Sequence, residues 1–454
     1  MLRFLTLLVI CQTLFCSAAS ADHPAGASPS GSAPTVSTTS ASITSGTTPS
    51  NIAKSISTQP GVPHTDSPST NFPAKTLDEV RLPAITDPIL RYSRIRYALF
   101  FASFFYSLAC LLLILQLGIA ARLRDTSIKI SRNKFFQVIS FSAMFTLVFA
   151  LLMLPFSLSS GFYVEHAFGL SHQSLPDFLV EKLKGIGVSL VLNAIAMTIF
   201  FGVVRRFRVH WPLILWTICI PVFAFAIFAE PIIIDPIFNK FTPMADGDLK
   251  SKITALAVKA KIPNAVILVA DKSKQTNKMN AYVTGIGNSS RIVLWDSTIS
   301  GLPEDQVLAV VGHEIGHYVL DHIYWGFGIM VLSVLSLVPF GYLGSNWFLS
   351  VLPRRWQIGS LSDYAITPAL LMLSLVVGFI SMPLFNYVSR YQEHQADKYG
   401  LELTDNRLAM ANLFISFAQK NLSEPDPPAI IKFFLFTHPT LKERIEFAAG
   451  RKVY

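Results

Sequence analysis

Long apolar runs recur along this chain, and they limit how it can fold more than any other feature. Six such runs follow residue 96, each close to the ~20 residues that a helix needs to cross the hydrocarbon core of a bilayer. They are 97–121, 136–158, 185–204, 211–228, 325–345 and 368–385. Only 14% of the 454 residues are charged, and 51% are hydrophobic, whereas about a quarter of a soluble protein is charged. We therefore predict an α-helical integral membrane bundle of about six spans that contacts the lipid bilayer.

The N-terminus has the pattern of a secretory signal over residues 1–21. Arg3 precedes a short apolar stretch, and Ala19-Ser20-Ala21 supplies small residues for cleavage. An uncleaved anchor is the alternative, although the stretch is short for a span. Residues 22–75 are rich in Ser, Thr and Pro and nearly lack aromatic residues, so we expect a disordered linker there.

Beyond the linker we expect two domains. Residues 76–228 should form an N-terminal membrane bundle of four spans, and residues 229–454 a catalytic domain that includes the spans 325–345 and 368–385. In a membrane protein the net charge of +9 indicates basic loops and lipid headgroup contacts, and no nucleic-acid-binding motif accompanies it. We expect no nucleic-acid partner. None of the four cysteines lies near the candidate site, so a metal must be held by His and carboxylate groups.

A possible metal-binding motif, HEIGH, lies at residues 313–317. On a helix, His313 and His317 share one face and can bind a single metal ion. Glu314 between them is turned partly away, where it can act as general base toward the attacking water. Short strands are expected at 265–270, 280–284 and 291–295, before a helix that begins near residue 302. This pattern predicts a small α+β, zincin-like domain.

Glu393 is the candidate for a third ligand because of its distance from the membrane. The motif helix should run without a break into the span at 325–345, and His317 lies eight residues before that span. Glu393 lies eight residues after the span 368–385, so both side chains should reach the same side at the same height, about 12 Å from the bilayer core. Asp397 follows at i+4, where it can accept a hydrogen bond from a ligating histidine. The alternative is a solvated acidic helix face.

At these residues the chain resembles the zinc-dependent type I CAAX prenyl endopeptidases and their prokaryotic relatives. The resemblance covers residues 97–446 and rests on separated motifs as well as on HEIGH. They are FYVEHAFG at 162–169, PIFNKFTP at 236–243, NAY at 280–282 with RIVLWD at 291–296, SRYQEHQAD at 389–397 and THPTLKERI at 437–445. Eukaryotic members have an additional early span that this chain replaces with its signal-like segment and linker.

The resemblance implies a role for each matching residue. His313, His317 and Glu393 would bind one Zn²⁺ per chain, and Glu314 would be the general base. His438 and Arg444 would steady the oxyanion and the carboxylates of the site. The strand at Asn280, Ala281 and Tyr282 would bind the substrate by edge-strand pairing.

Substrate and sidedness stay open at this point. A polypeptide with a prenylated CAAX C-terminus is one substrate class, and membrane protein quality control without prenyl specificity is equally compatible. A catalytically idle chaperone or translocon clamp and a site-2-type intramembrane protease are weaker alternatives. The loops 122–134, 205–210 and 354–355 contain ten Lys and Arg residues, whereas the loop 159–184 on the other side of the membrane contains two. The positive-inside rule therefore places the site on the extracytoplasmic side. This favours a bacterial inner membrane over the endoplasmic reticulum, whereas the resemblance implies a cytosolic site in eukaryotic members.

Overall fold

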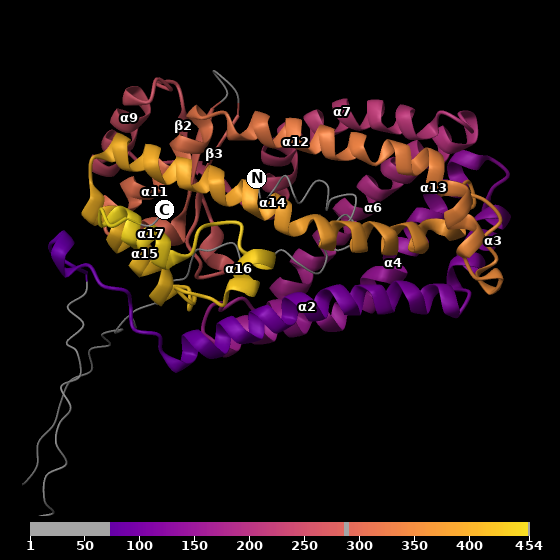
Figure 1. The fold of residues 1–454 in the computed structure, drawn as a ribbon, viewed down its shortest axis with the longest axis horizontal. Helices are drawn as coiled ribbons and strands as arrows, with labels where there is room; N and C mark the ends of the chain where they lie inside the picture. Colours follow the sequence, from indigo (N-terminus) through magenta and orange to yellow (C-terminus); the bar gives the residue numbers. More distant parts are fainter. Residues whose placement is uncertain (1–72, 286–289, 453–454) are drawn as a thin grey trace, which may run out of the picture.

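The computed structural model describes residues 73–285 and 290–452. The predicted signal at 1–21 and nearly all of the predicted linker at 22–75 lie outside the described residues. The molecule is elongated, with long helices along most of its length and a mixed domain of helices and strands at one end (Figure 1). The predicted combination of a membrane bundle and a small α+β domain is confirmed.

Helices form most of the described chain. The long ones are α2 (Asp87–Gln116), α3 (Ile119–Ile130), α4 (Lys134–Ser157), α6 (Leu175–Arg206), α7 (Trp211–Ala229), α12 (His322–Ser336), α13 (Val338–Val351) and α14 (Thr367–Thr404). Those of the mixed domain are α9 (Asp248–Lys259), α10 (Asp296–Gly301), α11 (Glu304–Val319), α15 (Arg407–Lys420), α16 (Ala429–Leu435) and α17 (Leu441–Ala448). Two short helices, α5 (Val164–Ala167) and α8 (Asp235–Phe238), follow π-helical turns.

Five helical segments within residues 73–285 and 290–452 are long and apolar enough to cross a membrane. They are Asp87–Gln116, Lys134–Ala167, Leu175–Arg206, His322–Val351 and Tyr364–Thr404. A sixth span is possible where Trp211–Ile227 and Glu230–Phe238 meet at an angle of 44°. The count agrees with the prediction of about six spans. The first predicted run ends early, at Gln116, because Gly118 adopts a left-handed conformation that turns the chain into α3.

The mixed domain contains one four-stranded sheet of order β1-β2-β4-β3. Its strands are β1 (Phe241–Pro243), β2 (Val266–Ala270), β3 (Ala281–Thr284) and β4 (Arg291–Trp295). β2 and β4 are parallel, and the other two pairs are antiparallel. The three predicted strands are present. β1 was not predicted, because three residues ending in a proline carry no alternation of polar and apolar positions.

Among the described residues, two large hydrophobic cores and a small cluster around Phe223 and Met330 hold the parts together. The core of the mixed domain lies where α11 packs against the sheet at β3, and it includes Ile292 and Leu294 of β4 and Val311 and Ile315 of α11, all at most 2% exposed. The core of the membrane bundle is separate, and its centre is a stacked row of phenylalanines on α4. Burial of apolar surface therefore fixes α11, the helix with the HEIGH motif, against the sheet.

One prediction about the motif helix is wrong. α11 ends at Val319, and α12 begins at His322 after a break at Leu320 and Asp321. Asp321 has a left-handed backbone conformation, with φ of 57°, so the helix does not continue into the span. The sequence contains no Gly or Pro at this point, which is why a continuous helix was expected. The break changes the helical phase of every residue that follows it.

Candidate metal centre

The candidate centre is built where α11 packs directly against α14. Glycines make this approach possible: a Cβ atom on Gly400 would lie 2.7 Å from the backbone nitrogen of His313, and one on Gly316 would lie 3.0 Å from the carbonyl oxygen of Ala396. Real Cβ atoms essentially never show the distance at Gly400, so this position requires glycine, and a side chain at position 316 would force its neighbour to shift. Close contact between the two backbones brings short side chains from both helices to one point. The HEIGH helix and the Glu393 helix are thereby joined next to the site.

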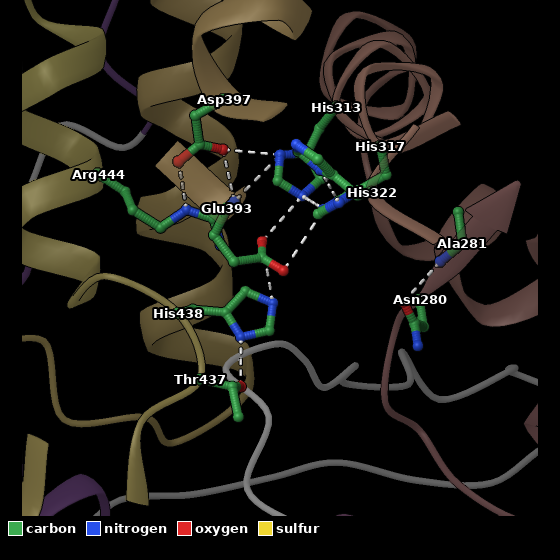
Figure 2. A network of polar contacts seen from close by, with 10 residues as sticks. All are labelled: Asn280, Ala281, His313, His317, His322, Glu393, Asp397, Thr437, His438 and Arg444. Atoms are coloured by element: carbon green, nitrogen blue, oxygen red, sulfur yellow. Dashed lines mark hydrogen bonds and ion pairs between the residues drawn. The ribbon is translucent and has the colours of Figure 1, made fainter. Parts of the chain in front are cut away.

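His313, His317 and Glu393 come together at this point (Figure 2), each offering one ligand atom within 4.8 Å of the others. The two Nε2 atoms are 3.2 Å apart, and they lie 3.2 Å and 3.4 Å from the carboxylate oxygens of Glu393. Tetrahedral ligand atoms with zinc bonds of about 2.0–2.1 Å are separated by about 3.3 Å. In addition, Glu393 is buried, and its Oε2 atom lies 3.2 Å from Nε2 of both His313 and His438. Spacing and donor types therefore fit a zinc ion.

Asp397 and Arg444 hold the first histidine in place. The Oδ1 atom of Asp397 lies 2.8 Å from Nδ1 of His313, and this leaves Nε2 facing Glu393. Arg444 donates two hydrogen bonds to Asp397, of 2.8 and 2.6 Å, and stacks on Phe414 at 4.1 Å. Burial works against a charged His313, but its hydrogen bonds to Asp397 and Glu393 outweigh this and raise its pKa to about 10.

Arg444 is buried beside Asp397. It is 5% exposed and its guanidinium group is engaged with Asp397, with the nearest histidine nitrogen 3.4 Å away. This contact is compatible with the role of steadying the carboxylates of the site that the resemblance implies. Burial would lower the pKa of Arg444, but Asp397 raises it, so the side chain stays protonated.

His322 contacts His317, the second histidine of the motif, and the sequence analysis did not predict this contact. Its Nδ1 atom lies 2.9 Å from Nδ1 of His317, and its Nε2 atom lies 3.3 Å from Oε1 of Gln395 on α14. On a continuous helix, position i+5 would point away from His317. The break at Asp321 resets the phase and turns His322 back toward the site. Only a signal for that break could have revealed the contact.

His438 approaches Glu393 from the loop before α17. Its Nε2 atom is 3.2 Å from Glu393 Oε2, and its Nδ1 atom is 2.8 Å from the hydroxyl of Thr437. In Figure 2 the carboxylate of Glu393 lies between His438 and the two histidines of α11. Burial lowers the pKa of His438 to about 4, so this imidazole is neutral at neutral pH and can donate an N–H.

Glu314 is half-buried on α11 next to the ligands. Burial raises the pKa of its carboxyl group above the ordinary value, and the two neighbouring histidines oppose this. A raised pKa brings a carboxylate closer to the neutral range in which a general base both accepts and returns a proton. This electrostatic setting is compatible with the role of general base expected for Glu314.

The candidate substrate strand lies across the site from Asp397 (Figure 2), beyond His317. β3 pairs with β4 alone among the described strands, so its other edge is unpaired. Ala281 is buried in the core, whereas Asn280 is exposed. Tyr282 faces away from the core, and its hydroxyl donates to Asp235 at 2.8 Å. The strand can thus offer its backbone N–H and C=O groups to a peptide, while the Tyr282 side chain is hydrogen-bonded to Asp235 on the other face.

Comparisons with known proteins agree with this geometry. Residues 243–452 match the model of peptidase family M48, and residues 69–240 match that of the CAAX prenyl protease N-terminal region, described as five membrane helices. An uncharacterized metalloprotease, YhfN of Bacillus subtilis, is 34% identical over 79% of this chain and 84% of its own length. The CAAX prenyl protease 1 homolog of Arabidopsis thaliana is 30% identical over 65% of this chain and 70% of its own.

A solved structure has the same fold. The crystal structure of S. mikatae Ste24p superposes with a TM-score of 0.69 at 25% identity, over 82% of this chain and 92% of that one. The site, the spans and the two family matches together cover both halves of the molecule. The chain is a membrane metalloendopeptidase, and it belongs to peptidase family M48, in the branch of the CAAX prenyl proteases.

Proposed function

We propose that this protein is a zinc metalloendopeptidase whose ion is held by His313, His317 and Glu393. The observation that carries the proposal is that one ligand atom from each of the three residues lies within 4.8 Å of the others, with the two histidine Nε2 atoms 3.2 Å apart, which suits tetrahedral zinc. When bound there, zinc supplies Lewis acidity, which polarises the scissile carbonyl and makes water more acidic. An intact ligand set speaks against a catalytically idle chaperone or clamp.

The protein's own groups then move the protons. Glu314 takes a proton from the attacking water and delivers it to the leaving amine, for which its raised pKa is suited. His438, neutral and close to Glu393, can donate its N–H to the oxygen of the carbonyl as charge develops there. Asp397, fixed by Arg444, keeps His313 in the tautomer that presents Nε2 to the metal.

The unpaired edge of β3 is suited to hold the substrate chain. An extended peptide that adds to this edge would form backbone hydrogen bonds, which position it without reading its sequence. α11 packs against β3, so such a peptide would lie beside Glu314 and the ligands. This mode favours a broad range of polypeptides at the site itself. Selectivity must then come from contacts farther away.

A prenylated CAAX C-terminus is the substrate class that the relatives' names support, since CAAX prenyl protease 1 proteins match over two thirds of this chain. The direct test compares cleavage of a farnesylated peptide with its unprenylated twin. A preference for the prenylated peptide supports CAAX processing. Equal cleavage of the two would point instead to membrane protein quality control without prenyl specificity.

We propose that the catalytic domain faces the extracytoplasmic side, as in a bacterial inner membrane. The three basic loops lie at one end of the molecule: Arg124 pairs with Asp363 at 2.9 Å, and Arg205 donates to the carbonyl oxygen of Ser362. This end is opposite the catalytic domain (Figure 1). The positive-inside rule assigns such loops to the cytoplasm. Digestion of a C-terminal tag from outside sealed cells supports this orientation, and full protection would reverse it.

The proposed reaction is tested by Glu314→Gln, which keeps the shape of the side chain but removes the base. We expect cleavage to fall about 10²–10⁴-fold with zinc content unchanged. The matched control is Glu304→Gln on the same helix, where the carboxylate is partly exposed and pairs with Lys252. This control should keep both zinc and activity. Undiminished cleavage by the Glu314 variant would remove the proposed mechanism.

A further inference from the structure

A cavity lies behind the sheet, on the face opposite α11. Its volume is about 550 Å³, and it is lined by Tyr282 and Thr284 of β3, by Val293 of β4 and by the segment between α7 and β1. The neighbours of these strand residues, such as Ile292, face the core instead. Since strand side chains alternate between the two faces, the cavity and the metal centre are on opposite sides of the same sheet.

The cavity is strongly basic. Lys184, Lys240, Lys274 and Arg291 line it, and no Asp or Glu is among the described residues that do so. Lys184 and Lys274 each have an acidic neighbour on their own element, at 3.2 and 3.0 Å. Lys240 and Arg291 form no ion pair with any residue in 73–285 or 290–452. At least two positive charges are therefore left to attract an anion.

A buried amide and an apolar wall complete the lining. Asn239 is 7% exposed, and its Oδ1 atom has no hydrogen-bond donor in the part of the chain that the structure describes. Leaving a buried acceptor unpaired is costly, so this atom is suited to accept from a ligand hydroxyl. Pro231, Ile237 and Phe238 add apolar surface. The lining thus fits a ligand that combines a negative charge, a hydroxyl group and an apolar part.

Two candidate membrane-spanning segments contribute to the cavity. Lys184 directly precedes the apolar run 185–204 within α6, and Pro231 lies two residues after the end of α7, in the segment Glu230–Phe238. The cavity therefore lies beside the start of one apolar run and the end of another, where lipid headgroups are expected. Basic pockets between membrane helices bind anionic lipid headgroups.

We propose that this cavity binds the headgroup of an anionic phospholipid that carries a free hydroxyl, such as a phosphoglycerol. Lys240 and Arg291 bind its phosphate, Asn239 accepts from its hydroxyl, and the apolar wall faces the glycerol and the first methylenes. Tyr282 lines the cavity and belongs to the candidate substrate strand, so the bound lipid would brace that strand from behind. The effect on peptide binding rests on the proposed function, whereas lipid binding itself does not.

The test uses the full chain in nanodiscs of phosphatidylcholine with or without phosphatidylglycerol, and native mass spectrometry counts the retained lipids. We expect phosphatidylglycerol to be retained by the wild type and about thirtyfold more weakly by the double variant Lys240→Gln/Arg291→Gln. The control variant Lys250→Gln/Lys252→Gln removes two charges from exposed ion pairs on α9 and should retain lipid like the wild type.

Three outcomes would overturn the proposal. The first is equal retention by the wild type and the cavity variant. The second is equal loss in the α9 control, which would indicate general surface attraction. The third is displacement of the lipid by millimolar inorganic phosphate, which would make the ligand a free anion. Cleavage assays in the two lipid mixtures are a separate readout. A Michaelis constant that depends on the lipid, with Glu314-dependent turnover still present, would support the effect on peptide binding.

Discussion

Two buried glutamates, Glu393 on α14 and Glu165 on α5, have opposite surroundings. Glu393, 6% exposed, faces the ring nitrogens of three histidines. Glu165, 3% exposed, accepts a hydrogen bond of 2.8 Å from the hydroxyl of Tyr92 and pairs with Arg96 at 3.4 Å and with Lys278 at 3.1 Å. Each carboxylate is held by side chains from distant parts of the sequence, yet only one is suited to bind a metal ion.

The difference lies in the partners. Imidazoles become neutral ligands once they lose a proton, so the Glu393 cluster can exchange protons for a divalent cation. Arginine and lysine offer no lone pair to a metal while charged, so the Glu165 cluster has its charge balanced by the protein itself. It also connects the domains, because Lys278 lies just before β3 and the neighbouring Asn277 donates to the carbonyl oxygen of Leu170. The Glu393 cluster is suited to bind a metal ion, whereas the Glu165 cluster connects the membrane bundle to the sheet.

The largest effect should come from Glu393→Gln, which removes the anionic ligand and preserves side-chain volume. Zinc supplies several kcal/mol of transition-state stabilisation, so cleavage should fall at least about a thousandfold. Zinc content, measured by mass spectrometry of the purified protein, should fall with it. Glu165→Gln is the matched control, because it also neutralises a buried carboxylate, and its zinc content should equal that of the wild type. Equal zinc loss in both variants would contradict the view that the Glu393 cluster, and not the Glu165 cluster, binds the metal ion.

A smaller effect is expected for Asp397→Asn, which leaves the ligands in place. The amide can still accept from His313, but Arg444 loses its counter-charge. Loss of such a supporting group typically weakens metal binding about 10–100-fold. Competition with a fluorescent zinc chelator measures this directly. Asp426→Asn, at an exposed ion pair with Lys442, should leave zinc affinity unchanged.

For Glu165→Gln we expect a loss of stability rather than of zinc. Removing one partner of a buried ion pair costs about 3–5 kcal/mol, because the buried cation of Arg96 loses the negative charge of Glu165. The measurement is the half-life at elevated temperature of the detergent-solubilised protein. Asp248→Asn, at an exposed pair with Lys252, should have the half-life of the wild type. An unaltered half-life for the Glu165 variant would contradict the bracing role.

The smallest effect should come from Tyr92→Phe, which removes one hydrogen bond and keeps both cations paired with Glu165. Hydrogen bonds to charged groups contribute about 1.5–3 kcal/mol, so this variant should fall between the wild type and Glu165→Gln in thermal half-life. If Tyr92→Phe has the same thermal half-life as Glu165→Gln, the hydrogen bond from the Tyr92 hydroxyl, rather than the charge of Glu165, stabilises this cluster.

Much of the membrane architecture could be predicted because a bilayer demands long apolar runs. The spans follow from these long runs, and three of the four strands follow from short apolar segments between turns. The pairing of Glu393 with the HEIGH motif could be predicted from equal distances along two spans. That reasoning assumed a straight helix beyond His317, and the break at Asp321 shows that the assumption was wrong. The helices still meet, because the glycine contact at Gly400 holds α11 and α14 together on the other side of the break.

Contacts made through irregular backbone could not be predicted from pattern. His322 reaches His317 only because of the left-handed Asp321, and His438 comes from a loop whose residues have no periodicity. For His438, the resemblance to a family was the only signal. Glu165 lies in FYVEHAFG, one of the motifs that carried the resemblance, but nothing nearby in the sequence indicated its cationic partners on α2 and before β3.

The central claim is that two histidines and one glutamate of this chain hold a single zinc ion. Zinc K-edge X-ray absorption of the purified wild-type protein tests it most directly. The account predicts about one zinc per chain, with two imidazoles and oxygen ligands at about 2.0–2.2 Å. A sulfur ligand near 2.3 Å, a single imidazole, or full cleavage activity in protein that contains no zinc would contradict it.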